Sequence, residues 1–177
     1  AFLILGTGTG GCICNENGVI YGKDSFAGEF HKLPFINFSN GKMDNMGDYA
    51  SMTALINIYN DKVDENVKIK YGHEVCNKYF EGDNTAKEAV DQWIDNILVQ
   101  LITITVFYNP EVICIGGGIS EEEWFINRIK DRYREECIRH TECDVITTKI
   151  DRCKYNNDAN ILGAIINASK KRTVIYN

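Results

Sequence analysis

The spacing of apolar residues changes along the chain, and each change predicts a different element. The opening stretch, AFLIL at 1–5, is entirely apolar and predicts a buried strand. Residues 12–22 form two apolar stretches around Asn17-Gly18, a dipeptide typical of a hairpin turn, and predict two further strands. From Asp48 to Tyr59 apolar residues recur at helical spacing, so a helix is expected there.

The longest predicted element is a helix that begins at residue 84 or 85 and ends at Tyr108. Its apolar residues spread around almost the whole circumference towards the C-terminal end, which predicts burial in the centre of the domain. A shorter helix over 73–83, ended by Gly82, precedes it. The later elements are expected in this order: a strand VICI within 111–120, a helix over 121–139, a strand over 144–150 and a helix over 156–172. This β-α-β-α order after an early hairpin indicates an α/β domain.

Residues 23–47 show neither the helical nor the strand spacing of apolar residues. They are rich in Gly, Asn and Ser, with scattered aromatic residues. A long irregular segment inside a compact domain is typically functional or disordered.

Two glycine clusters follow predicted strands directly: LGTGTGG at 5–11 and ICIGGGIS at 113–120. Ligands of open α/β sheets bind beyond the carboxyl ends of strands, and glycine there lets backbone N–H groups approach a phosphate or a flat base. The hydroxyls of Thr7 and Thr9 would add donors to phosphate oxygens. A tight turn is the alternative explanation for one cluster alone. Neither cluster has the P-loop lysine or the dinucleotide-binding glycine pattern, but together they favour a phosphate or nucleotide site.

Composition narrows the class of protein. The 177 residues suit a single domain, and a formal net charge of −6 argues against direct nucleic-acid binding. No apolar run approaches a membrane span and no signal peptide opens the chain. Seven scattered cysteines are expected to be reduced thiols, which favours a cytoplasmic protein. Because Ala1 leads straight into strand residues, we expect a piece of a longer polypeptide or a domain boundary.

Metal binding is not expected from the cysteines. Cys12 and Cys14 alternate along a predicted strand, so both point to one face as small core residues. His31 is not at a recognisable ligand spacing from them.

Four segments together resemble the large C-terminal lobe of the ROK family: LGTGTGG, AGEFH at 27–31, YNPEVICIGGGIS at 108–120 and NNDANILGA at 156–164. This family of sugar kinases and sugar-responsive repressors belongs to the actin/hexokinase/Hsp70 superfamily. The resemblance runs through essentially the whole chain. It implies a ribonuclease H-like (actin-like ATPase) α/β lobe, with a mixed sheet and helices on both faces, that forms a homodimer.

The resemblance also implies site residues. The first glycine turn would contact the β- and γ-phosphates of ATP, bound with Mg²⁺, through Gly6, Thr7, Gly8, Thr9 and Gly10. The second cluster would pack against the adenosine through Gly116, Gly117, Gly118 and Ser120. Glu29 occupies the place of a glutamate that binds the sugar, a hexose or an amino sugar. A carboxylate on a loop can accept two sugar hydroxyls at once.

The chain also departs from the family pattern. Lys32 stands where the family has a histidine, and His31 comes one residue early. Gly47 stands in place of a second sugar-binding glutamate; its neighbour Asp48 either substitutes for it or caps the helix. The family's zinc cluster, a histidine followed by three cysteines, is absent, so structural zinc is not expected.

The resemblance covers one lobe only. The N-terminal lobe, with its phosphate loop and the aspartate that acts as general base, has no counterpart in these 177 residues. The chain alone is therefore expected to be inactive, because phosphoryl transfer needs a positioned base and metal-bridged phosphates. Three alternatives remain: the large lobe of a sugar kinase, glucokinase-like or N-acetylmannosamine kinase-like; the sugar-sensing lobe of a repressor; or an α/β fragment that binds nothing.

Overall fold

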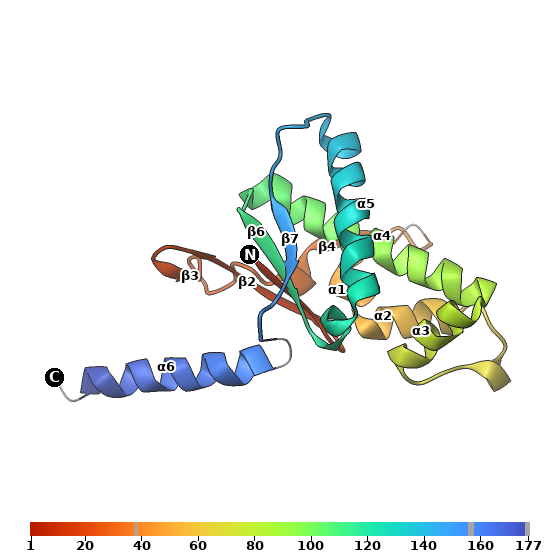
Figure 1. Cartoon of the computed structure of the whole chain (residues 1–177), viewed down its shortest axis with the longest axis horizontal. Helices are drawn as coiled ribbons and strands as arrows, with labels where there is room; N and C mark the ends of the chain where they lie inside the picture. The colour runs from red at the N-terminus through yellow and green to blue at the C-terminus, as the bar shows by residue number, and fades with distance from the viewer. Residues whose placement is uncertain (38, 156–157, 176–177) are drawn as a thin grey trace.

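A five-stranded mixed sheet forms the centre of the molecule (Figure 1). The computed structural model describes residues 1–37, 39–155 and 158–175. Along the sheet the strands run in the order β3 (Gly18–Ile20), β2 (Thr9–Asn15), β1 (Phe2–Leu5), β6 (Val112–Gly116) and β7 (Lys149–Arg152). β1 is antiparallel to β2 and parallel to β6, and β6 is parallel to β7. The expected mixed α/β sheet is therefore confirmed.

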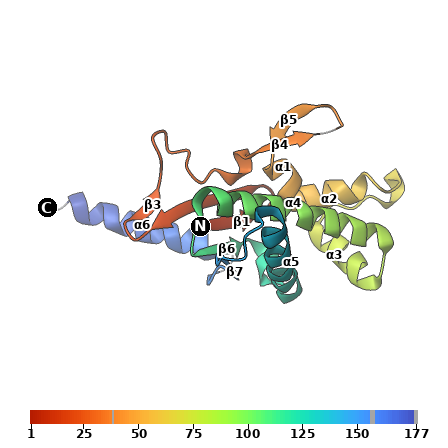
Figure 2. The ribbon, with the colours of Figure 1, turned by 90° about the horizontal axis from the view of Figure 1, so that it is seen from above.

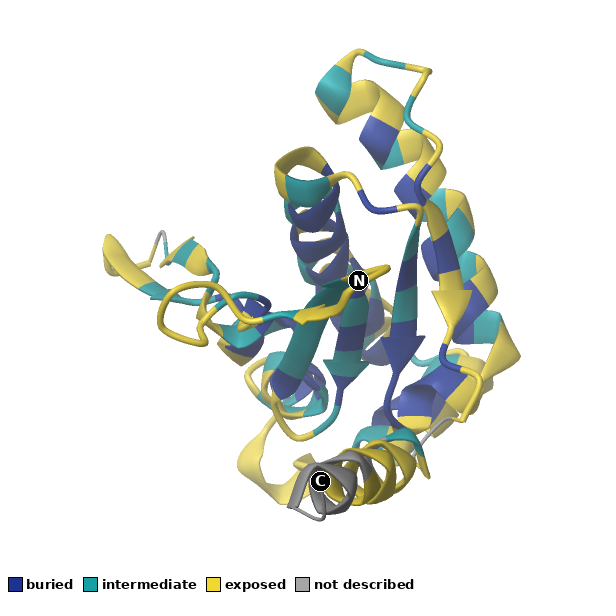
Figure 3. Cartoon of the chain, turned by 90° about the vertical axis from the view of Figure 1, so that its left-hand side faces the viewer, coloured by how far each residue is buried: buried dark blue, intermediate teal, exposed yellow. Residues whose placement is uncertain are grey.

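The two faces of this sheet differ in burial (Figure 3). Leu3, Leu5, Ile113 and Ile115 are completely buried on one face, because alternate strand residues point to the same side. On the opposite face, Phe2, Ile4, Cys12 and Cys114 are only partly buried and line a hollow of about 790 Å³ beside the first turns of the last helix.

In the described residues the α-helices are α1 (Gly47–Ala50), α2 (Met52–Asn60), α3 (Gly72–Glu81), α4 (Asn84–Tyr108), α5 (Glu123–Thr141) and α6 (Ala159–Ile175). Helix α4 packs against α2, α3 and α5, and its Trp93 is completely buried with its ring stacked on Phe125 at 5.2 Å. Figure 1 shows α6 set apart from the other helices, and in Figure 2 it passes beneath the sheet and its C-terminal end projects beyond β3. No helix in the described part of the chain is both long and apolar enough to cross a membrane.

The expected ends of α3 and α4 are confirmed. Gly82 ends α3 in the left-handed conformation, with φ 92°. Asp83 caps α4 by accepting the Ala86 N–H, and Asn109 ends that helix in the left-handed conformation before Pro110. The prediction that α4 is buried all round is wrong near its C-terminal end, where Val99, Val106 and Phe107 are exposed.

Two other boundaries differ from the sequence prediction. The helix expected from Asp48 breaks at Ser51, whose φ and ψ of −82° and 171° are extended. The last strand begins at Lys149 rather than residue 144, because only from Lys149 does the chain lie beside β6 and pair with it. Residues 156–157, the expected start of the last helix, lie outside the described residues.

The segment over 23–47 contains structure that its composition does not indicate. A 3₁₀ turn, η1 (Phe30–Lys32), is followed by a hairpin of β4 (Pro34–Asn37) and β5 (Lys42–Asn45). Two further 3₁₀ turns are η2 (Glu65–Val67) and η3 (Gly118–Glu121). The β4–β5 hairpin leads directly into α1.

Candidate functional site

Both glycine clusters lie at one edge of the sheet. Because β1 and β6 are parallel neighbours, with Ile4 paired to Gly116, their carboxyl ends meet. Gly117 has φ 92°, and an added Cβ would lie 2.7 Å from the carbonyl carbon of Leu5. The two loops are thus pressed together, as a shared ligand site at this edge requires.

The first cluster is divided between a turn and a strand. Only residues 6–8 form the turn, since Thr9 and Gly10 already pair in β2 with Leu5 and Ile4. Within the turn, the Gly6 N–H donates to the Gly8 carbonyl at 2.9 Å. The Gly6 carbonyl in turn accepts the N–H of Met52, the first residue of α2, at 2.9 Å.

Gly8 is the most accessible glycine of this turn. It is exposed, its φ is not positive, and an added Cβ would meet nothing within 4 Å. The fold itself therefore does not require glycine here, whereas close approach of a ligand to the backbone would. Thr7 is also exposed, and the buried Thr9 Oγ1 has no hydrogen-bond partner among the described residues. An exposed turn beside an unpaired hydroxyl suits an anion such as phosphate.

The second cluster is shaped mainly by packing. Gly116 is buried, and an added Cβ would lie 2.6 Å from Ile4 Cδ1. Ser120 is buried and its hydroxyl donates to the Gly117 carbonyl at 2.7 Å. Gly118 alone is exposed among the four residues assigned to this loop. Gly118 is therefore the residue of this loop with direct access to a ligand.

His31 and Asp48 lie together, with His31 Nε2 3.7 Å from Asp48 Oδ1. His31 belongs to η1 and Asp48 to the first turn of α1, so a tertiary contact joins the two elements. The capping alternative for Asp48 is wrong: Ser51 caps α2 by accepting the Ala54 N–H at 3.2 Å. Asp48 instead accepts a hydrogen bond from Asn45 Nδ2 at 3.4 Å.

Glu29 precedes η1 and is exposed. Its carbonyl accepts the N–H of Lys32 at 2.9 Å, while its carboxylate has no partner among the described residues. The preceding Gly28, with φ 85°, presses this loop onto β2, since an added Cβ would lie 2.7 Å from Cys12 Cα. An unpaired carboxylate on a fixed loop can accept hydrogen bonds from a ligand.

The sequence did not reveal the hydrogen bonds that tie α1 to the hairpin. Tyr49 Oη donates to Asp44 Oδ2 at 2.5 Å, and Asn37 Nδ2 donates to the same oxygen at 3.0 Å. The Tyr49 hydroxyl is the main reason that the pKa of Asp44 lies below its usual value, and Asp44 raises the pKa of Tyr49. The Asn40-Gly41 dipeptide was the available signal, because it is typical of a hairpin turn.

The cysteines of the sheet do not form a metal centre in the part of the chain described. No group of three or more His, Cys, Asp or Glu side chains lies close enough there to hold an ion. Burial raises the pKa of the Cys12 and Cys114 thiols, and that of Cys153 to about 11. These thiols stay protonated at neutral pH and are poor nucleophiles.

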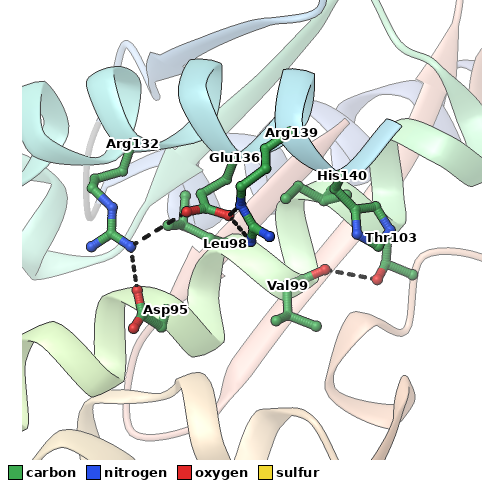
Figure 4. Close-up of a pocket in the computed structure, with 9 residues that line it drawn as sticks. Asp95, Leu98, Val99, Thr103, Arg132, Glu136, Arg139 and His140 are labelled. Carbon is green, nitrogen blue, oxygen red and sulfur yellow. Dashed lines mark hydrogen bonds and ion pairs between the residues drawn. The ribbon is translucent and has the colours of Figure 1, made fainter. Parts of the chain in front are cut away.

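A groove of about 410 Å³ between α4 and α5 is lined by charged residues that are already paired (Figure 4). Arg132 donates to Asp95 at 2.6 Å, and Arg139 pairs with Glu136. This groove lies along the C-terminal half of α5, whereas the glycine clusters lie near its N-terminal end. It is not part of the candidate ligand site.

The mixed sheet and its helices have the fold of one lobe of the actin-like ATPase fold class. The model of the ROK family matches residues 1–171, so the chain belongs to the ROK family. It is 34% identical over 176 residues to an uncharacterized protein of Clostridium perfringens, covering 94% of this chain and 54% of that protein. It is 27% identical to an N-acetyl-D-glucosamine kinase of Vibrio atlanticus, and the match covers 93% of this chain and 57% of that protein. The chain thus spans about half the length of these curated relatives.

Solved structures of ROK proteins share the fold. A ROK family protein of Streptococcus pneumoniae in complex with sucrose superposes with a TM-score of 0.84 and 24% identity, covering 97% of this chain and 58% of that one. A ROK family glucokinase of Streptomyces griseus in complex with glucose and AMPPNP superposes with a TM-score of 0.76 and 21% identity. The match covers 92% of this chain and 58% of that one. A ROK family transcriptional regulator superposes with a TM-score of 0.60 and 20% identity. The match covers 85% of this chain and 40% of that one. Kinases and regulators both use this architecture.

Proposed function

We propose that this chain is the nucleotide- and sugar-binding large lobe of an ATP-dependent sugar kinase. Membership of the ROK family and the kinases among its relatives support this proposal. The observation that carries it is Gly8, an exposed glycine that the fold does not require, at the edge where the two glycine loops meet.

On the nucleotide side, the turn would offer the backbone N–H groups of Thr7 and Gly8 to the phosphates, because that of Gly6 already donates within the turn. Gly118 would lie against the nucleoside. Thr7 would supply an exposed hydroxyl, whereas that of Thr9 is buried. Mg²⁺, when bound with ATP, would neutralise charge on the phosphates. The role of the chain is to hold the nucleotide, so no residue described above is assigned as the base.

On the sugar side, Glu29, His31 and Asp48 would bind hydroxyls of a hexose or an amino sugar. Carboxylates accept hydrogen bonds from hydroxyls, and an imidazole can accept or donate. Transfer of the phosphoryl group also needs a general base, which the proposal assigns to a second, N-terminal lobe. We therefore expect no sugar-dependent ATP turnover from these 177 residues alone.

The nucleotide assignment is tested by titrating the chain with Mg²⁺-ATP, followed by NMR. We expect weak binding to the wild-type chain, because one side of the cleft is present. Gly8→Val should weaken it at least tenfold while the fold is kept, since a side chain fits there. Ser39→Val, which also adds bulk to an exposed turn, is the matched control. Equal affinity in wild type and Gly8→Val would overturn the assignment.

The alternative is the sugar-sensing lobe of a ROK repressor. The similarity of fold to a ROK family transcriptional regulator favours this second candidate. A sensor needs no nucleotide, so sugar binding without any response of residues 6–10 to Mg²⁺-ATP would favour it over the kinase.

We also propose that the chain forms a homodimer through the exposed face of α4. Val99, Val106 and Phe107 are 46%, 63% and 93% exposed. Val99 also lines the groove of Figure 4. Val99 and Phe107 each lie four residues from Thr103. Two antiparallel α4 helices crossing at Thr103 would place Val99 opposite Phe107 on both sides, as a two-fold interface requires.

Seven free cysteines support a cytoplasmic location for this protein.

A further inference from the structure

Helix α1 has only four residues, so its position depends on its neighbours. An isolated helix of this length has no stability of its own. On the hairpin side, Tyr49 Oη donates to Asp44, whose carboxylate is also held by Asn37. The rings of Tyr49 and Phe35 lie 4.2 Å apart, which adds an apolar contact to the hydrogen bond.

Helix α4 holds α1 from the other side. Asn96 Nδ2 donates to the Tyr49 carbonyl at 2.9 Å, and Trp93 Nε1 donates to the Ala50 carbonyl at 3.0 Å. Both contacts reach the backbone of α1, whereas the contact with the hairpin is made by a side chain. The hydroxyl of Tyr49 therefore adds a side-chain contact that orients α1 against the hairpin, beside the hydrogen bond from Asn45 to Asp48.

That first turn carries Gly47 and Asp48, against which His31 packs. We infer that Tyr49 and Asp44 are positioning residues, which fix Asp48 opposite His31 and so preform the sugar-binding face of the lobe. The consequence of this positioning for sugar binding rests on the proposed function, whereas its effect on the His31–Asp48 pair does not. Removing the Tyr49 hydroxyl takes away the hydrogen bond to Asp44. The ring contact with Phe35, the hydrogen bond from Asn45 to Asp48 and the contacts with α4 remain.

The test compares Tyr49→Phe with Tyr133→Phe in the 177-residue chain. The control removes a buried hydroxyl, 2.6 Å from that of Thr105, on α5, whose main contacts are with α4, β7 and η3. Two readouts are used: the ring NMR signals of the three histidines, and titration with N-acetyl-D-glucosamine and D-glucose. In Tyr49→Phe we expect the His31 signals to shift, those of His73 and His140 to stay, and sugar affinity to fall at least fivefold. Tyr133→Phe should leave both readouts unchanged.

The outcomes separate this inference from the proposed function. Unchanged His31 signals in Tyr49→Phe would overturn the inference, whatever the sugar affinity. A His31 shift with no sugar binding to the wild-type chain would support the positioning role and count against the proposed sugar site. A shift of all three histidines would mean that the variant is generally perturbed, and would also overturn the inference.

Discussion

The imidazole ring of His31 occupies the space that a side chain at Gly47 would need. An added Cβ at position 47 would lie 2.6 Å from His31 Cγ, closer than real contacts allow. By the family resemblance, position 47 is that of a sugar-binding glutamate and the histidine is shifted by one residue. We propose that these two departures are linked, because the ring of His31 occupies the space beside Gly47.

Gly47→Ala should expel the ring and separate His31 from Asp48. We expect a change in the His31 NMR signals and at least a fivefold loss of sugar affinity, measured by titration with N-acetyl-D-glucosamine. Gly163→Ala is the control, because an added Cβ there meets nothing within 4 Å. If Gly47→Ala leaves the His31 signals in place, the ring does not depend on this glycine.

The Tyr49–Asp44 hydrogen bond should give a stability contribution that depends on pH at both ends. The pKa of Asp44 is lowered from 3.8, so its contribution is present above that pH and is lost as pH falls through the lower folded value. The pKa of Tyr49 is raised from 10.0, so its contribution is present below that pH and is lost as pH rises through the higher folded value. The difference in urea midpoint between wild type and Tyr49→Phe should be constant from about pH 5 to 9 and shrink outside that range.

Tyr133→Phe offers a contrast in the same experiment. Its partner is the hydroxyl of Thr105, which does not titrate, and burial raises the pKa of Tyr133 to about 12. The difference in urea midpoint between Tyr133→Phe and wild type should therefore persist in acid. A parallel decline of both differences in acid would show that general acid unfolding, rather than Asp44, is responsible.

Ser51→Ala should destabilise the chain by about 1 kcal/mol, the usual effect of removing a helix cap. Asp48→Ala should have a smaller effect on stability, because Asp48 caps no helix and is more than half exposed. Urea unfolding of both variants measures the difference. Equal losses would contradict the assignment of Ser51 as the cap of α2.

Phe107→Glu should abolish self-association if α4 forms the dimer interface, because a buried charge without a partner is costly. We expect the wild-type chain to sediment at twice its 20.1 kDa mass and the variant to sediment as a monomer. Met43→Glu, at a residue 73% exposed on the β4–β5 hairpin, is the control and should stay dimeric. A monomeric wild-type chain at high concentration would exclude the interface.

Periodicity predicted the elements that depend on their own residues. Helix α4 was found because its apolar positions recur over 25 residues, and β1 because it is apolar throughout. The hairpin β4–β5 was missed because each strand has only four residues, and none of the hairpin's residues in the described part of the chain is fully buried. Only the Asn40-Gly41 turn could have revealed it.

Local sequence cannot show contacts between distant segments, and the candidate site depends on these. His31 and Asp48 are 17 positions apart, and nothing in the spacing of either residue indicates the other. The start of β7 likewise follows from its pairing with β6, while the preceding Val145 is 76% exposed despite its strand-like character. In both cases the tertiary neighbour decides the outcome.

The hydrogen bond from Met52 N–H to the Gly6 carbonyl has a thermodynamic consequence. Met52 lies two residues after the end of α1, so a small displacement of α1 reaches the glycine turn through the extended Ser51. A sugar that immobilises Asp48 would lower the entropy still to be lost when the turn closes on a phosphate. Linkage then requires the reverse effect to be equal: bound nucleotide would raise the affinity for sugar by the same factor.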